Sequence, residues 1–157
     1  MHISAKADYA VRAALHLASV SEGPTTTDAI AQAQGIPGKF LEAIMTSLRT
    51  AGVVRSQRGP HGGYWLSRPA QEITVADVIR AVDGPLASVR GERPELVEYD
   101  GSARPLKDVW LAVRSALREV IEHVTLADLA TGALPARVVE RASEPHVWHT
   151  AATRLPE

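Results

Sequence analysis

The 157-residue chain contains no cysteine, and this absence removes several classes of protein at once. Without thiols there is no disulfide framework, no thiolate zinc site, no cysteine nucleophile and no all-cysteine iron–sulfur centre. Aromatic residues make up only 4% of the chain, which favours a helix-rich protein. No apolar run reaches the roughly 18 residues of a membrane span, and no signal-peptide pattern opens the chain. We therefore expect a soluble, cytoplasmic protein.

The net charge of −1 hides a polarised distribution of charge along the chain. Residues 1–68 carry seven Lys or Arg against four Asp or Glu, whereas residues 69–157 carry ten against fourteen. Within residues 37–68, Glu42 is the only acid. This pattern favours an N-terminal module that meets a polyanion, although a chance asymmetry on a solvated surface is the alternative.

The spacing of apolar residues predicts three helices at the start of the chain. The first covers residues 4–19 with Ser4 as its cap, and the second covers residues 28–34 with Thr27 as its cap. The third helix begins near Pro37 and ends near residue 51. Its predicted inner face consists of Phe40, Leu41, Ile44, Met45 and Leu48.

A β-hairpin follows the third helix. Two short β-rich segments, 53–56 and 63–67, flank a turn whose glycines and proline disfavour a helix. Three helices with a short turn before the third, followed by a hairpin, predict a winged helix-turn-helix domain. The third helix would enter the major groove, and Arg58 at the glycine-rich tip would reach a minor groove. The alternative is a small three-helix domain that binds protein.

The second half of the chain predicts a different organisation. A helix over 75–82, capped by Thr74, precedes a long irregular loop, and a strongly periodic helix of about 19 residues begins at Leu106. The predicted divisions are a winged helix-turn-helix domain at 1–84, a loop at 85–105, a long helix with a short following helix at 106–132, and a tail at 133–157 without clear periodicity. The fold class is mainly α with a small β wing.

Several segments together resemble the Rrf2 family of bacterial winged-helix regulators, over about residues 1–132 and in order. These segments are ISAKADYAV at 3–11, GIPGKFLE at 35–42, LRTAGVVRS at 48–56, RGPHGGY at 58–64, ITVADVIRAVDG at 73–84 and VTLADL at 124–129. The resemblance implies a homodimer that binds a palindromic operator through one wing and one third helix in each half-site. The apolar seam of the long helix agrees with this, although a core helix of a monomer would show the same pattern. The predicted dimer contacts are Leu106, Val109, Trp110, Val113, Leu117, Val120, Ile121 and Val124.

The resemblance also implies which residues meet DNA, since relatives read bases with the start of the third helix. Lys39 would donate to guanine or phosphate, and Glu42 would accept from a cytosine amino group. Phe40 would either contact a thymine methyl group or belong to the core, and the core is favoured. The full set of candidate DNA contacts is Lys6, Gly38, Lys39, Phe40, Glu42, Arg49, Arg55, Arg58 and His61. Within it, Arg58 is expected to touch a groove, and Lys6, Arg49, Arg55 and His61 to touch phosphate or only solvent.

One departure from the family concerns its iron–sulfur cluster. Many relatives hold a cluster through three cysteines in the loop before the long helix, whereas the nearest counterparts here are Glu92, Glu98 and Arg104. Lys107 stands where some relatives place a histidine ligand, and Asp8 where one relative uses a carboxylate. A thiolate-ligated cluster is therefore excluded, and no cofactor is expected. The signal would be a small molecule, a partner protein, or none.

Other candidate sites are weaker. His146 and His149 could share a metal if the tail were helical, but no third ligand lies nearby in the sequence. Trp65 and Trp110 could line an effector pocket, although a core position is favoured for both. No nucleophile–base pair or phosphate-binding glycine loop stands out, so an enzyme is not expected. The sequence predicts a dimeric DNA-binding regulator, most simply a repressor, with a protein-interaction module as the alternative.

Overall fold

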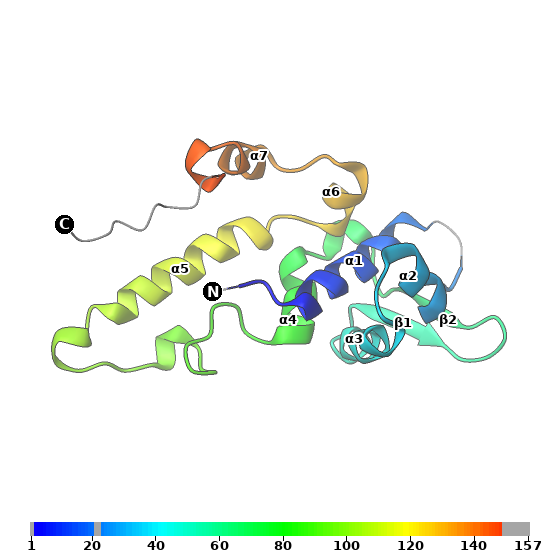
Figure 1. The fold of residues 1–157 in the computed structure, drawn as a ribbon, viewed down its shortest axis with the longest axis horizontal. Helices are drawn as coiled ribbons and strands as arrows, with labels where there is room; N and C mark the ends of the chain where they lie inside the picture. The colour runs from blue at the N-terminus through cyan, green and yellow to red at the C-terminus, as the bar shows by residue number, and fades with distance from the viewer. Residues whose placement is uncertain (1, 21–22, 149–157) are drawn as a thin grey trace.

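The computed structural model describes residues 2–20 and 23–148 of the chain. A group of helices and a two-stranded hairpin lies at one end, and one long helix extends away from it (Figure 1). The elements in chain order are α1 (Ala5–Ser19), α2 (Thr27–Gln34), α3 (Gly38–Thr50), β1 (Val54–Gln57), β2 (Gly63–Leu66), α4 (Val75–Asp83), α5 (Leu106–Ile121), α6 (Leu126–Thr131) and α7 (Ala136–Ala142). The mainly α fold with a β-hairpin wing is confirmed.

The first two helices begin at hydroxyl caps. The Ser4 hydroxyl accepts a hydrogen bond of 2.9 Å from the backbone N–H of Ala7, as the sequence predicts. For α2 the prediction was wrong by one residue, because Thr26, not Thr27, accepts from the N–H of Ala29 at 3.2 Å. Three threonines in a row offer three possible caps, and the backbone places Thr26 in the extended conformation that a cap requires.

The hairpin is tied to the helices by an additional backbone segment. Val54 lies opposite Leu66 in the antiparallel register of β1 and β2. Thr25, before α2, exchanges two backbone hydrogen bonds of 2.9 and 2.8 Å with Tyr64 of β2. At Gly63 a Cβ atom would lie 2.6 Å from the Thr25 carbonyl oxygen, so this close approach requires glycine.

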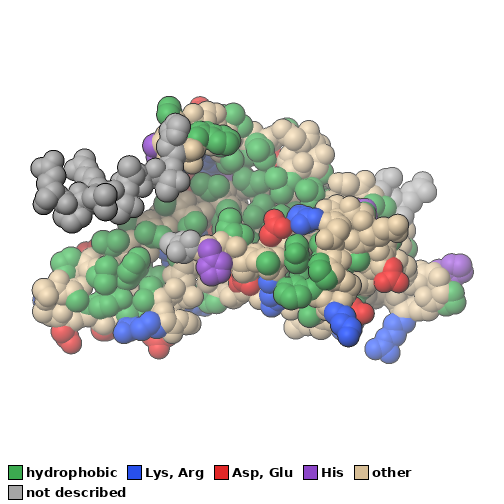
Figure 2. Space-filling view, in the orientation of Figure 1, with side chains coloured by type: hydrophobic (Ala, Val, Ile, Leu, Met, Phe, Trp, Pro, Cys, Tyr) green, Lys and Arg blue, Asp and Glu red, His purple; other side chains and the backbone are tan. Residues whose placement is uncertain are grey.

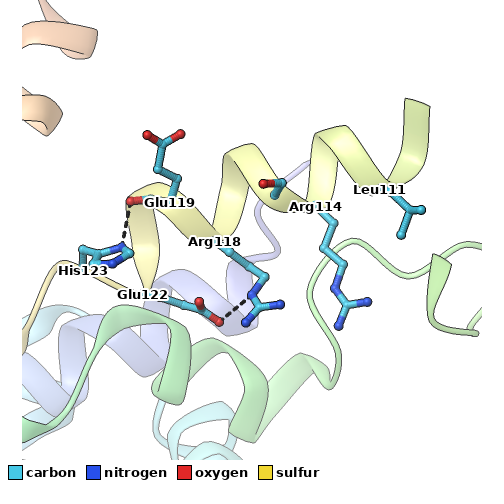
Figure 3. Close-up of a pocket in the computed structure, with 7 residues that line it drawn as sticks. Leu111, Arg114, Arg118, Glu119, Glu122 and His123 are labelled. Carbon is cyan, nitrogen blue, oxygen red and sulfur yellow. Dashed lines mark hydrogen bonds and ion pairs between the residues drawn. The ribbon is translucent and has the colours of Figure 1, made fainter. Parts of the chain in front are cut away.

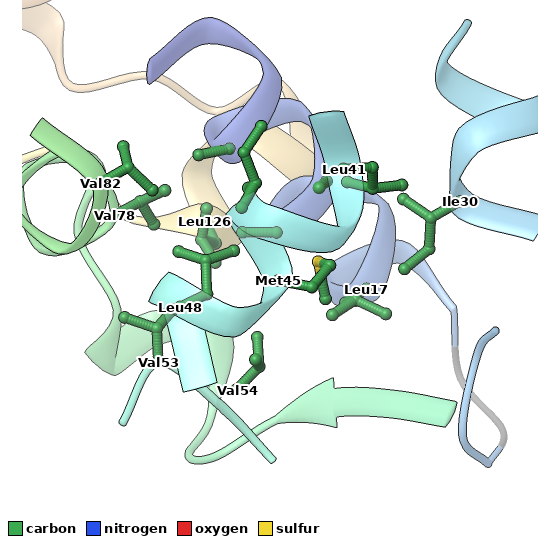
Figure 4. Packing of buried hydrophobic residues seen from close by; sticks show 14 of the residues in the cluster. Leu17, Ile30, Leu41, Met45, Leu48, Val53, Val54, Val78, Val82 and Leu126 are labelled. Carbon is green, nitrogen blue, oxygen red and sulfur yellow. The ribbon is translucent and has the colours of Figure 1, made fainter. Parts of the chain in front are cut away.

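The hydrophobic core lies between α1, α3 and α4, and Figure 4 shows its side chains converging from these elements. Small alanine side chains on α1 (Ala10, Ala13 and Ala14) are fully buried and allow its neighbours to pack close to its backbone. The larger buried side chains include Ile30, Leu41, Ile44, Met45, Leu48, Ile73, Val78 and Leu126. Removing such a side chain from a packed core typically costs about 2–5 kcal/mol of the free energy of unfolding.

The chain returns to this core after the long helix. Thr74 and Thr125 each begin a capping box, in which the threonine hydroxyl and an aspartate three residues later satisfy each other's backbone N–H. Residues 73–75 and 124–126 are joined by two backbone hydrogen bonds of 2.9 Å. Leu126 of α6 is therefore part of the core of the winged domain, although the sequence grouped it with the long helix.

Three predictions about the second half require correction. The long helix ends at Ile121, not at Val124, because the chain turns after Glu122 and the Val124 carbonyl accepts from the Val75 N–H. The tail is not irregular throughout, since α7 begins after Pro135 and is tied to α5 by an ion pair of 2.9 Å between Arg141 and Glu119. The loop from 85 to 105 contains short 3-10 turns at 94–96 and 101–103. Within the described residues no helix combines the length and apolar character of a membrane span.

Candidate nucleic-acid interface

The outward face of α3 carries a small mixed set of side chains. Leu41, Ile44, Met45 and Leu48 are completely buried and fix the opposite face on the core. The exposed residues of the first two turns are Gly38, Lys39, Phe40, Glu42 and Ala43. No side chain caps the start of α3, which follows Pro37 directly. The start of the helix thus presents one basic side chain, one acidic side chain and an apolar patch to solvent. The sequence analysis did not include Ala43 among the candidate contacts, because alanine has no hydrogen-bonding or charged group.

Phe40 does not lie on the inner face of α3, and this prediction was wrong. Its side chain is 49% exposed. The ring lies at the margin of the core face, where it meets the Tyr9 ring edge to face, with 5.9 Å between centroids and 87° between planes. Leu41 and Ile44, which periodicity assigned to the same face, are fully buried there.

The wing presents its predicted basic residue to solvent. Arg58 and His61 are both exposed in the turn between β1 and β2, which is closed by a 2.9 Å backbone hydrogen bond from Gly62 to Gly59. Figure 2 shows Lys and Arg side chains projecting from the side of the molecule that carries α3 and the hairpin. An exposed arginine on a glycine-rich turn has the reach that a minor-groove contact needs.

Two further predicted contacts lie together at the base of the hairpin. Arg49 and Arg55 border a hollow of about 570 Å³ beside Trp65, together with Arg68. Arg49 is near Ser56, at 3.4 Å from its hydroxyl, whereas Arg68 forms an ion pair of 3.1 Å with Asp77. Trp65 is half-buried, not fully buried as expected, because it lies opposite Arg55 on the outer face of the hairpin.

The ammonium group of Lys6 already makes a hydrogen bond within the protein. Its ammonium group donates to the backbone carbonyl of Val82 at 2.6 Å, at the end of α4. This bond joins the start of α1 to α4, next to a 2.5 Å hydrogen bond from the Ser4 hydroxyl to Asp83. A phosphate contact by Lys6 would require the ammonium group to leave that carbonyl.

The long helix α5 has a charged face directed at its own domain. Arg80 of α4 forms an ion pair with Glu122, which Arg118 also contacts at 2.9 Å. Figure 3 shows Arg114 and Arg118 extending from α5 toward the same side, whereas Glu119 points the other way. The guanidinium groups of Arg80 and then Arg118 hold the pKa of the Glu122 carboxyl below its ordinary value.

The apolar stripe of α5 is only partly covered within the described chain, since Leu117 and Ile121 line a hollow with Ile79 of α4. No residue of this 16-residue helix is buried, and Val109 is 50% exposed. Figure 2 shows hydrophobic side chains gathered over the part of the surface that α5 occupies. Seven of the predicted dimer contacts lie on the helix, whereas Val124 lies beyond its end and is 95% buried in its own protomer, since its exposed fraction is 5%. Val124 therefore does not extend the stripe.

Two ion pairs and a hydrogen bond fasten the loop before α5 to the helix. Glu95 pairs with Arg114, and Glu98 pairs with Lys107 at 2.7 Å. The indole N–H of Trp110 donates to the hydroxyl of Tyr99 at 3.1 Å, so Trp110 is half-buried against the loop. A backbone hydrogen bond at Glu95, helped by Arg114, holds the pKa of the Glu95 carboxyl below its ordinary value.

The residues of this loop do not fit an iron–sulfur cluster. Of the three counterparts to cysteine ligands, Arg104 is a cation, and Glu98 is paired with Lys107, itself the counterpart of a histidine ligand. Thiolates are the usual ligands of such clusters, and this chain has none. Over residues 2–20 and 23–148, no group of three or more His, Asp or Glu is placed to hold a metal ion. His146 contacts Glu144 at 3.3 Å, and His149 lies outside the described residues.

Comparison with known proteins agrees with this architecture. The Rrf2 family, described as iron-dependent transcriptional regulators, matches residues 3–132. A putative HTH-type transcriptional regulator of Mycobacterium tuberculosis is 52% identical over 145 residues, which cover 92% of this chain and 90% of the relative. The structure of CymR, the global cysteine regulator of B. subtilis, has a TM-score of 0.69 and 36% identity, covering 83% of this chain and 97% of CymR. The structure of T. potens IscR has a TM-score of 0.68 and 32% identity, covering 95% of this chain and 97% of that IscR chain. The chain therefore belongs to the Rrf2 family and is a DNA-binding transcriptional regulator with a winged helix-turn-helix fold, and not an enzyme.

Proposed function

We propose that the chain is a homodimeric repressor that binds a palindromic operator without a thiolate-ligated iron–sulfur cluster. The observation that carries this proposal is the combination of exposed polar and basic side chains on α3 and the wing with a long helix on which no apolar residue is fully buried. One α3 and one wing offer a small contact area. Joining two copies makes the second half-site contact effectively intramolecular, which multiplies the affinity.

In this proposal α3 enters the major groove and the wing reaches the neighbouring minor groove. Lys39 and Glu42 contact base edges from the exposed start of α3, and Arg58 contacts the minor groove. Arg49, Arg55, His61 and Lys6 contact phosphates, the last only if it leaves Val82. Repression follows from occupancy, because a bound dimer excludes RNA polymerase from an overlapping promoter. Such a regulator acts in the cytoplasm, on the chromosome.

The stripe on α5 supports the dimer in a specific way. Its charged face is already engaged by its own α4 and loop through Arg80, Arg114 and Arg118, so the helix cannot rotate its apolar side inward without breaking these ion pairs. The part of the apolar side that its own protomer leaves accessible, such as Val109, is therefore available to a second copy. The two wings would then meet half-sites separated by about one helical turn of DNA or a multiple of it.

Selection of bound sequences from a random duplex library tests this function directly. The purified protein is used at about 100 mM salt, where phosphate contacts still favour binding. Enrichment of an inverted repeat supports dimeric, sequence-specific recognition. Failure to bind any duplex at low salt, by protein that is folded, would contradict the proposal and favour a protein-interaction module. A small molecule or partner protein that signals through this dimer should change the operator affinity by about 1–3 kcal/mol.

A further inference from the structure

A small hollow opens along the flank of α3, beside its first two turns, where Lys6 at the start of α1 approaches the helix. Its volume is about 250 Å³, and its lining residues are Lys6, Lys39, Phe40, Ala43 and Ile44. Ile44 is fully buried, while Phe40 and Ala43 are exposed at the surface. The hollow therefore has an apolar interior on the element that the proposed function places in the major groove.

The aromatic wall of this hollow is exposed and yet held in place. The Phe40 ring meets the edge of the Tyr9 ring at 5.9 Å between centroids, and the Arg12 guanidinium lies 5.6 Å from the centre of the Tyr9 ring. Arg12 in turn donates to the Gln34 carbonyl and contacts Asp8 at 3.3 Å. A side chain fixed in this way loses little conformational freedom on binding, which lowers the cost of a contact.

The flanks of the hollow are basic. Lys39 is exposed, and the ammonium group of Lys6 is turned to the Val82 carbonyl at 2.6 Å, so that the aliphatic stem of Lys6 forms part of the apolar wall. Lys39 therefore supplies the exposed positive charge beside an apolar hollow, and this combination matches a polyanion that carries small apolar groups. Among the four bases of duplex DNA, only thymine presents an apolar group, its C5-methyl, in the major groove.

We propose that Phe40 and Ala43 form a binding site for the C5-methyl group of a thymine in the operator half-site. This inference rests on the proposed function, and it adds a base identity to it. The two side chains lie three residues apart on neighbouring turns of the helix and line the same hollow of about 250 Å³, which has room for a methyl group. Glu42, between them in sequence, is free to accept from the amino group of a neighbouring base.

Replacement of thymine by deoxyuridine tests this site, because it removes the methyl group and keeps the base pair. Each thymine of the selected operator half-site is replaced in turn, and the affinity of the full-length protein is measured by titration. The wild-type protein should lose about fourfold in affinity at one position, the value of one buried methyl group. Phe40→Ala should bind the thymine operator more weakly and show no further loss with deoxyuridine at that position.

Two matched variants separate this contact from general effects. Phe40→Leu keeps an apolar side chain and should keep part of the response to the methyl group. Lys39→Ala should weaken binding to both duplexes equally and keep the full fourfold response. If Phe40→Ala does not fold, as judged by circular dichroism, Ala43→Ser replaces it in the same cycle and should likewise lose the response.

The outcomes distinguish this inference from the proposed function. Sequence-specific binding that ignores deoxyuridine at every thymine of the half-site overturns the methyl site and leaves the repressor proposal intact. A full response to the methyl group in Phe40→Ala or Ala43→Ser also overturns the methyl site and leaves the repressor proposal intact. That result is expected if the hollow receives a side chain of a protein partner. Absence of any sequence-specific duplex binding overturns both.

Discussion

Arg80 of α4 and Glu122 at the end of α5 form an ion pair that joins the winged domain to the long helix. The Glu122 carboxylate also forms an ion pair with Arg118, so it binds two guanidinium groups. Because α4 packs on α1 and α3, this pair and the backbone hydrogen bond from Val75 to Val124 together hold the direction in which α5 leaves the domain. In the proposed dimer that direction sets the separation of the two recognition helices.

Glu122→Gln should lower the free energy of unfolding at pH 7 by under about 1 kcal/mol, as expected for partly exposed ion pairs, and the melting temperature should fall slightly. Since the folded-state pKa of Glu122 is lowered, its contribution is present above an ordinary value of 4.5 and is lost as the pH falls through the lowered value. The difference between wild type and variant should therefore shrink below about pH 4.5. Thermal unfolding across this pH range measures it, with Glu72→Gln, an exposed acid, as the control. A difference that grows toward low pH would contradict the role of this pair.

Val109→Asp should convert the dimer to a monomer. The Val109 side chain is 50% exposed within the protomer, so a charge there should change the stability of the folded monomer little. In a dimer interface the same charge would be buried without a partner, which destabilises the dimer. Light scattering after size-exclusion chromatography gives the mass directly. Ser115→Asp places the same charge on the opposite side of α5 and should leave the dimer intact. A normal dimer from Val109→Asp would remove the apolar stripe as its interface.

Arg58→Ala should lower operator affinity and make its salt dependence shallower. Each phosphate neutralised by a basic side chain contributes about −0.9 to the slope of log K against log salt, and a homodimer loses two such side chains, so a change of roughly 1.8 in the slope is expected. Titrations at several salt concentrations measure both quantities. Arg137→Ala removes the same charge from α7, distant from the wing in Figure 1, and serves as the control. An unchanged slope would exclude Arg58 from the interface.

Gly63→Ala should destabilise the protein, whereas Gly38→Ala should not. At Gly63 the backbone has φ of 152°, and a Cβ atom would lie within 2.9 Å of three backbone atoms of Thr25. The pairing of Thr25 with Tyr64 would have to separate, at a cost of about 1–3 kcal/mol. Gly38 has ordinary backbone and open space around it, so alanine there should stabilise by about 0.4–1 kcal/mol. Chemical denaturation of both variants checks the contrast, and equal stability would refute the clash.

Local patterns in the sequence predicted most of the elements of this fold. Ser4 and Thr74 cap the helices that they were expected to cap, because capping depends on residues within one turn. Gly35 ends α2 in the left-handed conformation for the same local reason. The hairpin followed from its glycines and proline, and the family followed from several short segments in register.

The predictions were wrong where contacts between distant segments, and not the local pattern, decide whether a residue is buried or helical. Phe40 fits the apolar period of α3, yet Leu41 and Ile44 fill the core and Tyr9 holds the ring at the surface. The length of α5 was overestimated because its apolar period continues to Val124, and pairing with Val75 draws that residue out of the helix. The apolar pattern of a helix shows which residues are apolar, but it does not show which other segment packs against them.

By itself the sequence determined the winged helix-turn-helix order, the family, the lack of thiolate ligands and the basic character of α3 and the wing, since each of these depends on residue identity and short-range spacing. Only the tertiary structure decided that Leu126 completes the core from beyond the long helix, that ion pairs turn the charged face of α5 inward, and that Phe40 and Ala43 border an open hollow. These features depend on which surfaces meet across large sequence separations, and packing free energy selects those surfaces from the many that one apolar pattern allows.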